Sequence, residues 1–425
     1  MKRRTFFQSA ALGGMAAAMT PLASCSNATH TDQEAGERYR LLGELLLQPV
    51  FKKELFTAPV IIASVELLRF ENSYICRVRS EEGAEGISVA HNDMRFLVPI
   101  FVHKVQPYFI GQDARELDLI VEKVFDFHFN FRYGGIPLGI PLATIEFAIL
   151  DMMGKIAGLP MGQLVGDLHN EKVGVYVATE FRERPLEEHF EKILETVAAY
   201  DAKAIKIKVG YLFAGSRDIH DPGLPGKSEK LVPMVREHYG SDWSLYADSN
   251  GYYDAEGAIR MGRILEENNY AYFEEPVMFN HFLEIKKVTD ALSLPVANGE
   301  QDHSYYNFRW LLSNEGLEIV QPDNYYFGGF IRSMRVARMA DALGKTCIPH
   351  MSGGALGYLY NSHFVSVLPN AGEHHEFKGY RTHVPFECPT SSLKVEDGKI
   401  TVPTGPGLGI EIDPDFIEKH SPVNA

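Results

Sequence analysis

The stretch AIKIKVG at residues 204–210 is a short apolar strand, and the same pattern returns in SLYADSN (244–250), YAYFEEP (270–276) and LPVANGE (294–300). Helical stretches separate these strands, and the series continues on both sides with VGVYVAT (173–179), IVQPDN (319–324), TCIPHM (346–351) and HHEFKG (374–379). Eight strand–helix units in about 200 residues are typical of a (β/α)₈ TIM-type barrel, an α/β fold. Because periodicity does not prove that a ring of strands closes, a doubly wound open sheet is the alternative.

The segments on both sides of the barrel predict further units. Residues 57–170 read as an antiparallel meander followed by helices, so we expect an α+β capping domain there. The barrel itself is assigned to residues 171–379, and residues 380–425 are expected to pack back on the cap. Residues 26–56 are interpreted as a polar tether and a lead-in helix.

The composition excludes several classes of protein. The 425 residues include 41 basic and 56 acidic ones, a net charge of −15, which disfavours nucleic acid and anionic membranes as partners. An anionic substrate therefore needs a local positive site. Apolar residues make up 45% of the chain, enough for a large packed core. The cysteines show no CxxC spacing and indicate neither a zinc site nor a disulfide framework; they are Cys25, Cys76, Cys347 and Cys388.

The first 25 residues are expected to be a signal rather than part of the fold. The start MKRRTFF, followed by a short run of small apolar residues, resembles a twin-arginine export signal. The segment LASC (22–25) resembles a lipobox, in which Cys25 is lipidated and becomes the new N-terminus. We therefore expect an exported, periplasmic or cell-envelope protein that meets the membrane only through a lipid anchor. The alternative is a disordered basic tail on a cytoplasmic enzyme.

Three carboxylates end three successive strands of the predicted barrel. Asp248, Glu274 and Glu300 are separated by 26 residues each, one strand–helix unit, so they are expected at the same rim, where barrel enzymes place their chemistry. Carboxylates that close repel one another unless they share a proton or a cation. An oxygen-only set favours Mg²⁺, with Mn²⁺ as a substitute, over zinc. The alternative is three unrelated solvated acids.

Two lysines precede this set on the strand before it. Lys206 and Lys208 are two residues apart, so both side chains face the same side of the strand, which we take to be the barrel interior. Neighbouring ammonium groups are expected to depress each other's pKa and make one of them a usable base. Lys208 lies nearer the strand end and is predicted to be that base. Lys206 is predicted to tune it and to contact the substrate carboxylate.

The remaining strand ends carry a second set of candidate catalytic groups. Asp323 and His350 end the sixth and seventh strands, and a carboxylate bonded to a histidine would fix its tautomer and raise its basicity. Glu376, on the eighth strand, is predicted to be a protonated hydrogen-bond donor to the substrate. Its alternative is a salt bridge at the bottom of the barrel. The long segment 211–230 offers Arg217, Asp218 and His220, for which solvation is the favoured interpretation.

Taken together, these motifs resemble the enolase superfamily, in its mandelate racemase, muconate lactonizing enzyme and acid-sugar dehydratase branch. The resemblance runs from about residue 57 to the C-terminus and is carried by IKIKVG, ADSNG, FEEPV, ANGE, QPDNYYFGG, PHMSGG and the helix IEFAILDMMGK. It implies magnesium ligands at Asp248, Glu274 and Glu300, a base at Lys208, and a substrate or metal contact at Asn250.

The same resemblance implies that Asp323 and His350 form a second catalytic dyad, that Glu376 contacts the enolate, and that cap loops around residues 71–95 select the substrate. The expected reaction is removal of the proton α to a carboxylate through an enediolate, most simply dehydration of an acid sugar to a 2-keto-3-deoxy acid. A racemase, epimerase or cycloisomerase uses the same groups, and an exported binding protein without activity is the alternative from another class. We also expect a homo-oligomer.

Overall fold

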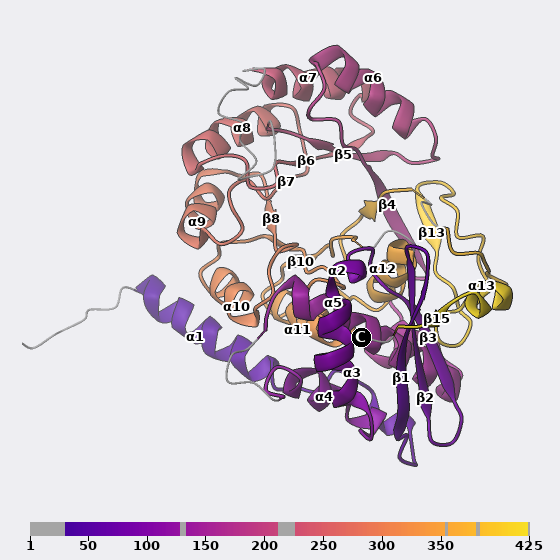
Figure 1. Cartoon of the computed structure of the whole chain (residues 1–425). Coiled ribbons are helices and arrows are strands. Elements are labelled where there is room, and N and C mark those ends of the chain that lie inside the picture. Colours follow the sequence, from indigo (N-terminus) through magenta and orange to yellow (C-terminus); the bar gives the residue numbers. More distant parts are fainter. Residues whose placement is uncertain (1–29, 128–132, 211–225, 353–355, 380–382, 424–425) are drawn as a thin grey trace, which may run out of the picture.

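A closed ring of eight strands forms the centre of the molecule (Figure 1). The computed structural model describes residues 30–127, 133–210, 226–352, 356–379 and 383–423. The strands pair in parallel in the order β10-β9-β8-β7-β6-β5-β4-β11. They are β4 (Lys172–Ala178), β5 (Ala204–Lys208), β6 (Ser244–Asp248), β7 (Tyr272–Glu274), β8 (Val296–Asn298), β9 (Ile319–Val320), β10 (Thr346–Cys347) and β11 (His375–Phe377).

The ring closes between its last two strands. Cys347 of β10 forms a parallel bridge with Ala371, just before β11, and β11 pairs with β4. The strand order follows the chain without the reversal that defines a doubly wound sheet. The (β/α)₈ prediction is therefore confirmed, and the open-sheet alternative is wrong. The outer helices are α6 (Leu186–Val197), α7 (Lys227–Tyr239), α8 (Ala255–Glu267), α9 (Phe282–Ala291), α10 (Tyr305–Ser313), α11 (Phe330–Asp341) and α12 (Gly357–Ser366).

Side-chain alternation divides the barrel interior into an apolar layer and a charged layer. Tyr246 and Tyr272 lie two residues before Asp248 and Glu274, so each pair faces the same side of its strand. The tyrosine rings stack with centroids 4.4 Å apart and belong to a buried cluster with Tyr176, which closes the barrel at the amino-terminal ends of the strands. The charged layer therefore lies at the carboxyl-terminal mouth.

The capping unit contains an antiparallel meander, as expected. Strands β1 (Ile62–Phe70), β2 (Ser73–Ser80) and β3 (Glu85–Val89) pair in sequence. The cap helices are α2 (Met94–Ile100), α3 (Gln106–Phe109), α4 (Leu117–Lys123) and α5 (Ile136–Ala157), with a π-helical turn at Phe101–Val105. Short 3₁₀ turns lie at Lys53–Leu55, Ala114–Glu116 and Met161–Leu164.

The C-terminal segment joins both units. Strand β15 (Ser421–Pro422) pairs with β1 and extends the cap sheet, while β13 (Lys399–Thr401) pairs antiparallel with β4 of the barrel. Strands β12 (Phe386–Glu387) and β14 (Glu411–Ile412) pair with each other, and α13 (Pro414–Glu418) follows. The cap sheet is therefore completed by the end of the chain.

Helix α5 fastens the cap to the barrel. Of the helices described, it alone is long and apolar enough to cross a membrane, but it is almost wholly buried in the protein. Oε1 of its buried Glu146 accepts the N–H of Ile331 (3.1 Å) at the start of α11. A Cβ at Gly329, where φ is +112°, would lie 2.3 Å from Oε2 of Glu146, so glycine makes this approach feasible. Asp151 accepts the N–H groups of Ile87 and Leu408 (both 2.8 Å) and so joins β3 to the C-terminal segment.

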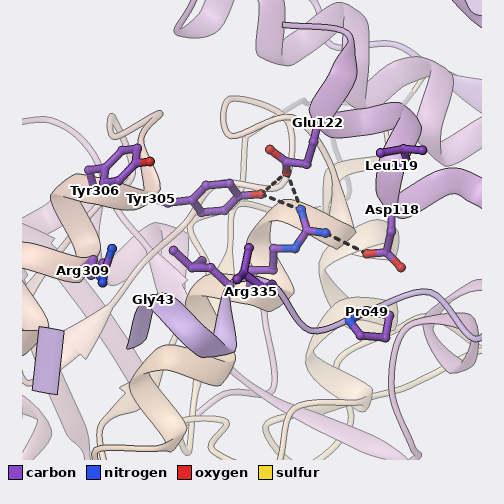
Figure 2. A pocket seen from close by; sticks show the side chains of 11 residues that line it. Gly43, Pro49, Asp118, Leu119, Glu122, Tyr305, Tyr306, Arg309 and Arg335 are labelled. Atoms are coloured by element: carbon purple, nitrogen blue, oxygen red, sulfur yellow. Dashed lines mark hydrogen bonds and ion pairs between the residues drawn. The ribbon is translucent and has the colours of Figure 1, made fainter. Parts of the chain in front are cut away.

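The lead-in helix α1 (His30–Leu45) packs on α10 and α11, and a cavity of about 610 Å³ lies between it, α4, α10 and α11. Figure 2 shows that Arg335, Glu122 and Asp118 point toward one another, whereas Arg309 lies apart from them. Arg335 donates to Asp118 (3.0 Å) and to Glu122, which also accepts from the Tyr305 hydroxyl (2.6 Å). Because these groups pair with one another, we interpret the cavity as a structural contact between α1, α4, α10 and α11 rather than a reactive site.

Candidate active site

Three buried carboxylates from neighbouring strands meet at the barrel mouth. Each of Asp248, Glu274 and Glu300 offers an oxygen, and these atoms all lie within 4.8 Å of one another. Asp248 and Glu274 are direct partners in the β6–β7 register, and Glu300 lies two residues after β8. Burial, and then the charge of Glu275, holds the pKa of Glu300 well above its usual value. An oxygen-only cluster with this excess of negative charge fits a hard divalent cation.

Both predicted lysines lie inside the barrel beside this cluster. The Lys206 Nζ donates to Oε1 of Glu274 (2.6 Å) and lies 3.1 Å from Oε1 of Glu376. It also lies 5.1 Å from the centroid of the Tyr176 ring beneath it. The Lys208 Nζ donates to Oδ2 of Asp248, its register partner on β6. The structure therefore brings each lysine into an ion pair with a member of the carboxylate cluster.

The expected depression of the lysine pKa values is wrong. Burial lowers the pKa of Lys206, but Glu274 and Glu376 raise it more, so that it lies well above the usual lysine value. The pKa of Lys208 is also raised: burial and Lys206 lower it, but its acidic neighbours, Asp248 first and then Glu180, raise it. The lysine pair was correctly placed, but its carboxylate neighbours dominate its electrostatics.

Asp323 and His350 form the expected hydrogen-bonded pair. The two residues bridge in parallel just beyond β9 and β10, and Oδ2 of Asp323 lies 2.7 Å from Nδ1 of His350. The other carboxylate oxygen of Asp323 accepts the N–H groups of Tyr325 and Tyr326 (both 2.8 Å). The imidazole is therefore fixed at Nδ1, and its Nε2 is directed at Glu300 and Glu376, at 3.5 and 3.4 Å.

Glu376 lies within the site, but its expected protonation is wrong. Burial raises its pKa, but the nearby cations, Lys206, Lys378 and His350 among them, together lower it by more, so that the pKa lies well below the usual value. Its Oε2 accepts the N–H of Met351 (2.9 Å). A carboxylate that accepts this bond and faces these cations is ionised, and it lies at the mouth rather than in a salt bridge at the barrel bottom.

Asn250 connects the lysine side of the site to the first barrel loop. Its Oδ1 accepts from the Lys208 Nζ (2.9 Å) and from the guanidinium of Arg182 (2.7 Å). Lys227, at the start of α7, donates to the carbonyls of Arg182 (2.8 Å) and Arg184 (2.6 Å), and burial lowers its pKa to about 8. This chain of contacts holds the Lys208 ammonium in position.

Lys378 and Gln321 belong to the site and were not predicted. The Lys378 Nζ lies 3.2 Å from Nε2 of His350, and Gln321 donates to Oε2 of Glu274 (2.7 Å). Each lies two residues from a predicted site residue, Lys378 after Glu376 and Gln321 before Asp323. The two-residue period that identified the lysine pair on β5 would have identified both.

The cap reaches the dyad through His91, which follows β3 and lies in the loops expected to select the substrate. Its ring meets that of Tyr326 edge-on at 5.4 Å, and Tyr326 lies 6.1 Å from the His350 ring. Burial lowers the pKa of His91. Arg217, Asp218, His220 and Cys25 fall outside the described residues.

Comparison with known proteins places this geometry in a family. The profile described as enolase C-terminal domain-like matches residues 189–416, more than half of the chain. The chain belongs to this family. Arabinonate dehydratase of Saccharolobus solfataricus is 26% identical over 328 residues, which cover 76% of this chain and 83% of that protein. D-Galactarolactone cycloisomerase of Agrobacterium fabrum is 28% identical over 319 residues, which cover 73% and 81%.

A solved structure agrees with this enolase-like assignment. The mandelate racemase/muconate lactonizing protein from Paracoccus denitrificans PD1222, complexed with magnesium, has a TM-score of 0.74 at 26% identity. The likeness covers 86% of this chain and 99% of that one. The predicted resemblance to the enolase superfamily is therefore confirmed, and so is the prediction of an enzyme whose relatives include lyases and isomerases.

Proposed function

We propose that this enzyme removes the proton α to the carboxylate of a sugar acid and then eliminates the β-hydroxyl, giving a 2-keto-3-deoxy acid. The observation that carries the proposal is the placement of two candidate proton-transfer centres around one carboxylate cluster. Lys208 lies on β5 and the Asp323–His350 pair beyond β9 and β10, and β4 and β11 separate β5 from β10 on the shorter way around the ring.

Asp248, Glu274 and Glu300 would hold Mg²⁺, for which Mn²⁺ is a substitute. When bound, such a cation stabilises the negative charge that develops on a substrate carboxylate during α-proton removal. The magnesium in the relative from Paracoccus denitrificans supports this assignment. Lys206, which is 1% exposed, is positioned to add a fixed positive charge beside the same carboxylate.

In this proposal Lys208 accepts the α-proton. Asn250 orients its Nζ by accepting a hydrogen bond from it, and Arg182 in turn donates to the same oxygen of Asn250. The ion pair with Asp248 keeps a proton on Lys208. A cation held by Asp248 would weaken this ion pair and so would favour Lys208 as a base. His350, held at Nδ1 by Asp323, donates a proton from Nε2 to the leaving hydroxyl. The electron pair of the enediolate forms the Cα–Cβ double bond, water leaves, and the enol tautomerises to the 2-keto acid.

An isomerase is the second candidate, because the same two groups could deprotonate and reprotonate one carbon. The cycloisomerase relative supports this alternative, whereas arabinonate dehydratase supports dehydration. An exported binding protein without activity would be expected to lack a ligand or a base. All of the predicted groups are present and buried at the mouth, which favours catalysis.

A screen of acid sugars with Mg²⁺ tests the proposal. We expect at least one aldonic or aldaric acid to give a 2-keto acid, detected by carbonyl derivatisation, and to exchange its α-proton in heavy water. Lys208→Met serves as the inactive control. Exchange with inversion but without 2-keto acid would favour the isomerase, and absence of both reactions from the whole panel would refute α-proton chemistry.

The proposal also includes an exported protein that is lipid-anchored at Cys25 and assembles as a homo-oligomer. The N-terminal pattern RRTFF and the segment LASC support export and lipidation. Twin-arginine export moves folded proteins, so a metal site could be loaded before transport.

A further inference from the structure

Lys378 is a third lysine at the barrel mouth, and its strand β11 is separated from β5 by β4 alone. It follows β11 directly and lies two residues after Glu376, so both side chains leave the chain on the same face. Its side chain is 33% exposed, whereas that of Glu376 is 1% exposed. Lys378 is therefore a cation that borders the open mouth rather than the buried floor of the site.

Three polar atoms surround the Lys378 ammonium. Its Nζ lies 3.0 Å from the carbonyl oxygen of Met351, 3.3 Å from Oε2 of Glu376 and 3.2 Å from Nε2 of His350. Asp323 binds the opposite ring nitrogen of His350, so Nε2 is the nitrogen left for a substrate. Lys378 and the reactive nitrogen of His350 therefore face the same small volume.

We infer that Lys378 binds the leaving β-hydroxyl together with His350 and commits the intermediate to elimination rather than to reprotonation. This inference rests on the proposed function and deepens it. As the Cβ–O bond breaks, its electron pair goes to the oxygen, and His350 supplies the proton that converts it to water. An ammonium beside that oxygen stabilises the charge that develops before the proton arrives.

A purely structural role for Lys378 predicts a different outcome. If Lys378 only neutralised Glu376, its loss would disturb Glu376 and Lys206, and proton abstraction and elimination would fall together. If it acts on the leaving group, abstraction by Lys208 continues because Lys208 contacts Asp248 and Asn250 instead. The ratio of α-proton exchange to dehydration therefore separates the two roles.

The test compares Lys378→Met and Lys378→Arg with the wild-type enzyme, using the acid sugar found in the screen. Lys394→Met, at an exposed position of the C-terminal segment, is the matched control. Dehydration by Lys378→Met should fall at least ~10²-fold, the usual loss when one transition-state donor is removed. Its α-proton exchange in heavy water should be at least as fast as in wild type, because an intermediate that no longer eliminates returns by reprotonation, and Lys378→Arg should recover part of the dehydration.

Three outcomes overturn the inference. Equal losses of exchange and dehydration in both variants would show a structural role, and unchanged dehydration would show no role. A wild-type enzyme that neither exchanges the α-proton nor forms a 2-keto acid would refute the proposed function and the inference with it. Circular dichroism and Mg²⁺ titration of each variant identify misfolding, and if Lys378→Met is misfolded the exchange-to-dehydration ratio of Lys378→Arg decides.

Discussion

Oδ2 of Asp323 lies 2.7 Å from Nδ1 of His350. The two residues are neighbours in an isolated parallel β-bridge. The same carboxylate accepts two backbone N–H groups and the hydroxyl of Ser352 at 2.9 Å. Because Oδ1 takes these bonds, Oδ2 remains directed at the imidazole. The pair is therefore oriented by the backbone of the loop that follows β9, which makes its catalytic role testable by small substitutions.

Asp323→Asn should reduce kcat at least ~10²-fold with little effect on folding, because an asparagine oxygen can keep the backbone bonds while its amide nitrogen donates to Nδ1. That donation forces the proton of the neutral imidazole onto Nε2. Steady-state kinetics with a thermal melt measure both effects. Ser352→Ala, which removes one contact to the same carboxylate, should lose less than about tenfold; comparable losses in both variants would contradict a tautomer effect.

Lys208 and His350 should control different steps. Lys208→Ala should stop α-proton exchange for substrates whose proton faces β5, and His350→Asn should block elimination, each by at least ~10²-fold. If His350 acts only on the leaving group, His350→Asn should still exchange the α-proton in heavy water, as followed by NMR. Loss of exchange in His350→Asn would instead make His350 the abstracting base. Small effects in both variants, with Mg²⁺ still bound, would mean that the site assignment is wrong.

Removal of divalent cations should abolish turnover, and Mg²⁺ or Mn²⁺ should restore it, because three carboxylates within 4.8 Å repel one another without a shared charge. Chelator titration with elemental analysis measures this dependence. Glu300→Gln should weaken cation binding, while Glu318→Gln, which removes the partner of Lys345, should not. Full activity in excess chelator, with no bound metal, is incompatible with the proposed mechanism.

The positions of the site residues could be predicted because a barrel converts sequence spacing into spatial order. Each strand–helix unit advances one position around the ring, so a 26-residue interval brings Asp248, Glu274 and Glu300 to one rim without knowledge of any contact. The predicted strands were longer than the observed ones: β8 ends at Asn298, so Glu300 lies on the loop beyond it. The predicted position of Glu300 at the rim is nevertheless correct, because the loop continues beyond the carboxyl end of β8 toward the barrel mouth.

The protonation states of the site residues could not be predicted, because the direction of each pKa shift depends on neighbours from other strands. The lysine pair suggested mutual repulsion, but Glu274 and Glu376 face Lys206 across the barrel and reverse the shift. Glu376 was expected to be neutral because its site is crowded with anions, but Lys206, Lys378, His350 and Lys208 lower its pKa. The contact between His91 of the cap and Tyr326 of the barrel could not be predicted either, since it depends on how the cap packs on the barrel.

The N-terminal signal makes a prediction about the mature protein. Intact mass of the natively produced enzyme should correspond to a chain that starts at Cys25 and carries a lipid, and the protein should partition into detergent. Cys25→Ser should abolish the lipid but leave the catalytic rate unchanged, because the described fold begins only with α1. A mass that retains Met1 would refute export, and cleavage at another residue would refute lipidation alone.

Glu146 should make the stability of the protein fall between about pH 5 and pH 8. Burial raises its pKa to about 8, although the N–H groups of Ile331 and Phe330 act in the opposite direction. The folded state then keeps a proton that the unfolded state releases near pH 4.5, so its stabilising effect is complete below that pH and is lost as pH rises toward 8. The slope is at most about 1.4 kcal/mol per pH unit from this group.

Glu146→Gln isolates this contribution, because glutamine keeps an acceptor for the Ile331 N–H but does not ionise. Urea unfolding at pH 5.5, 6.5, 7.5 and 8.5 should show the variant gaining stability relative to wild type up to about pH 8, and no further gain above it. The exposed Glu187→Gln on α6 should follow wild type throughout. If Glu146→Gln also runs parallel to wild type, Glu146 is ionised in the folded protein, and the contact between α5 and the start of α11 holds a charge rather than a neutral carboxyl group.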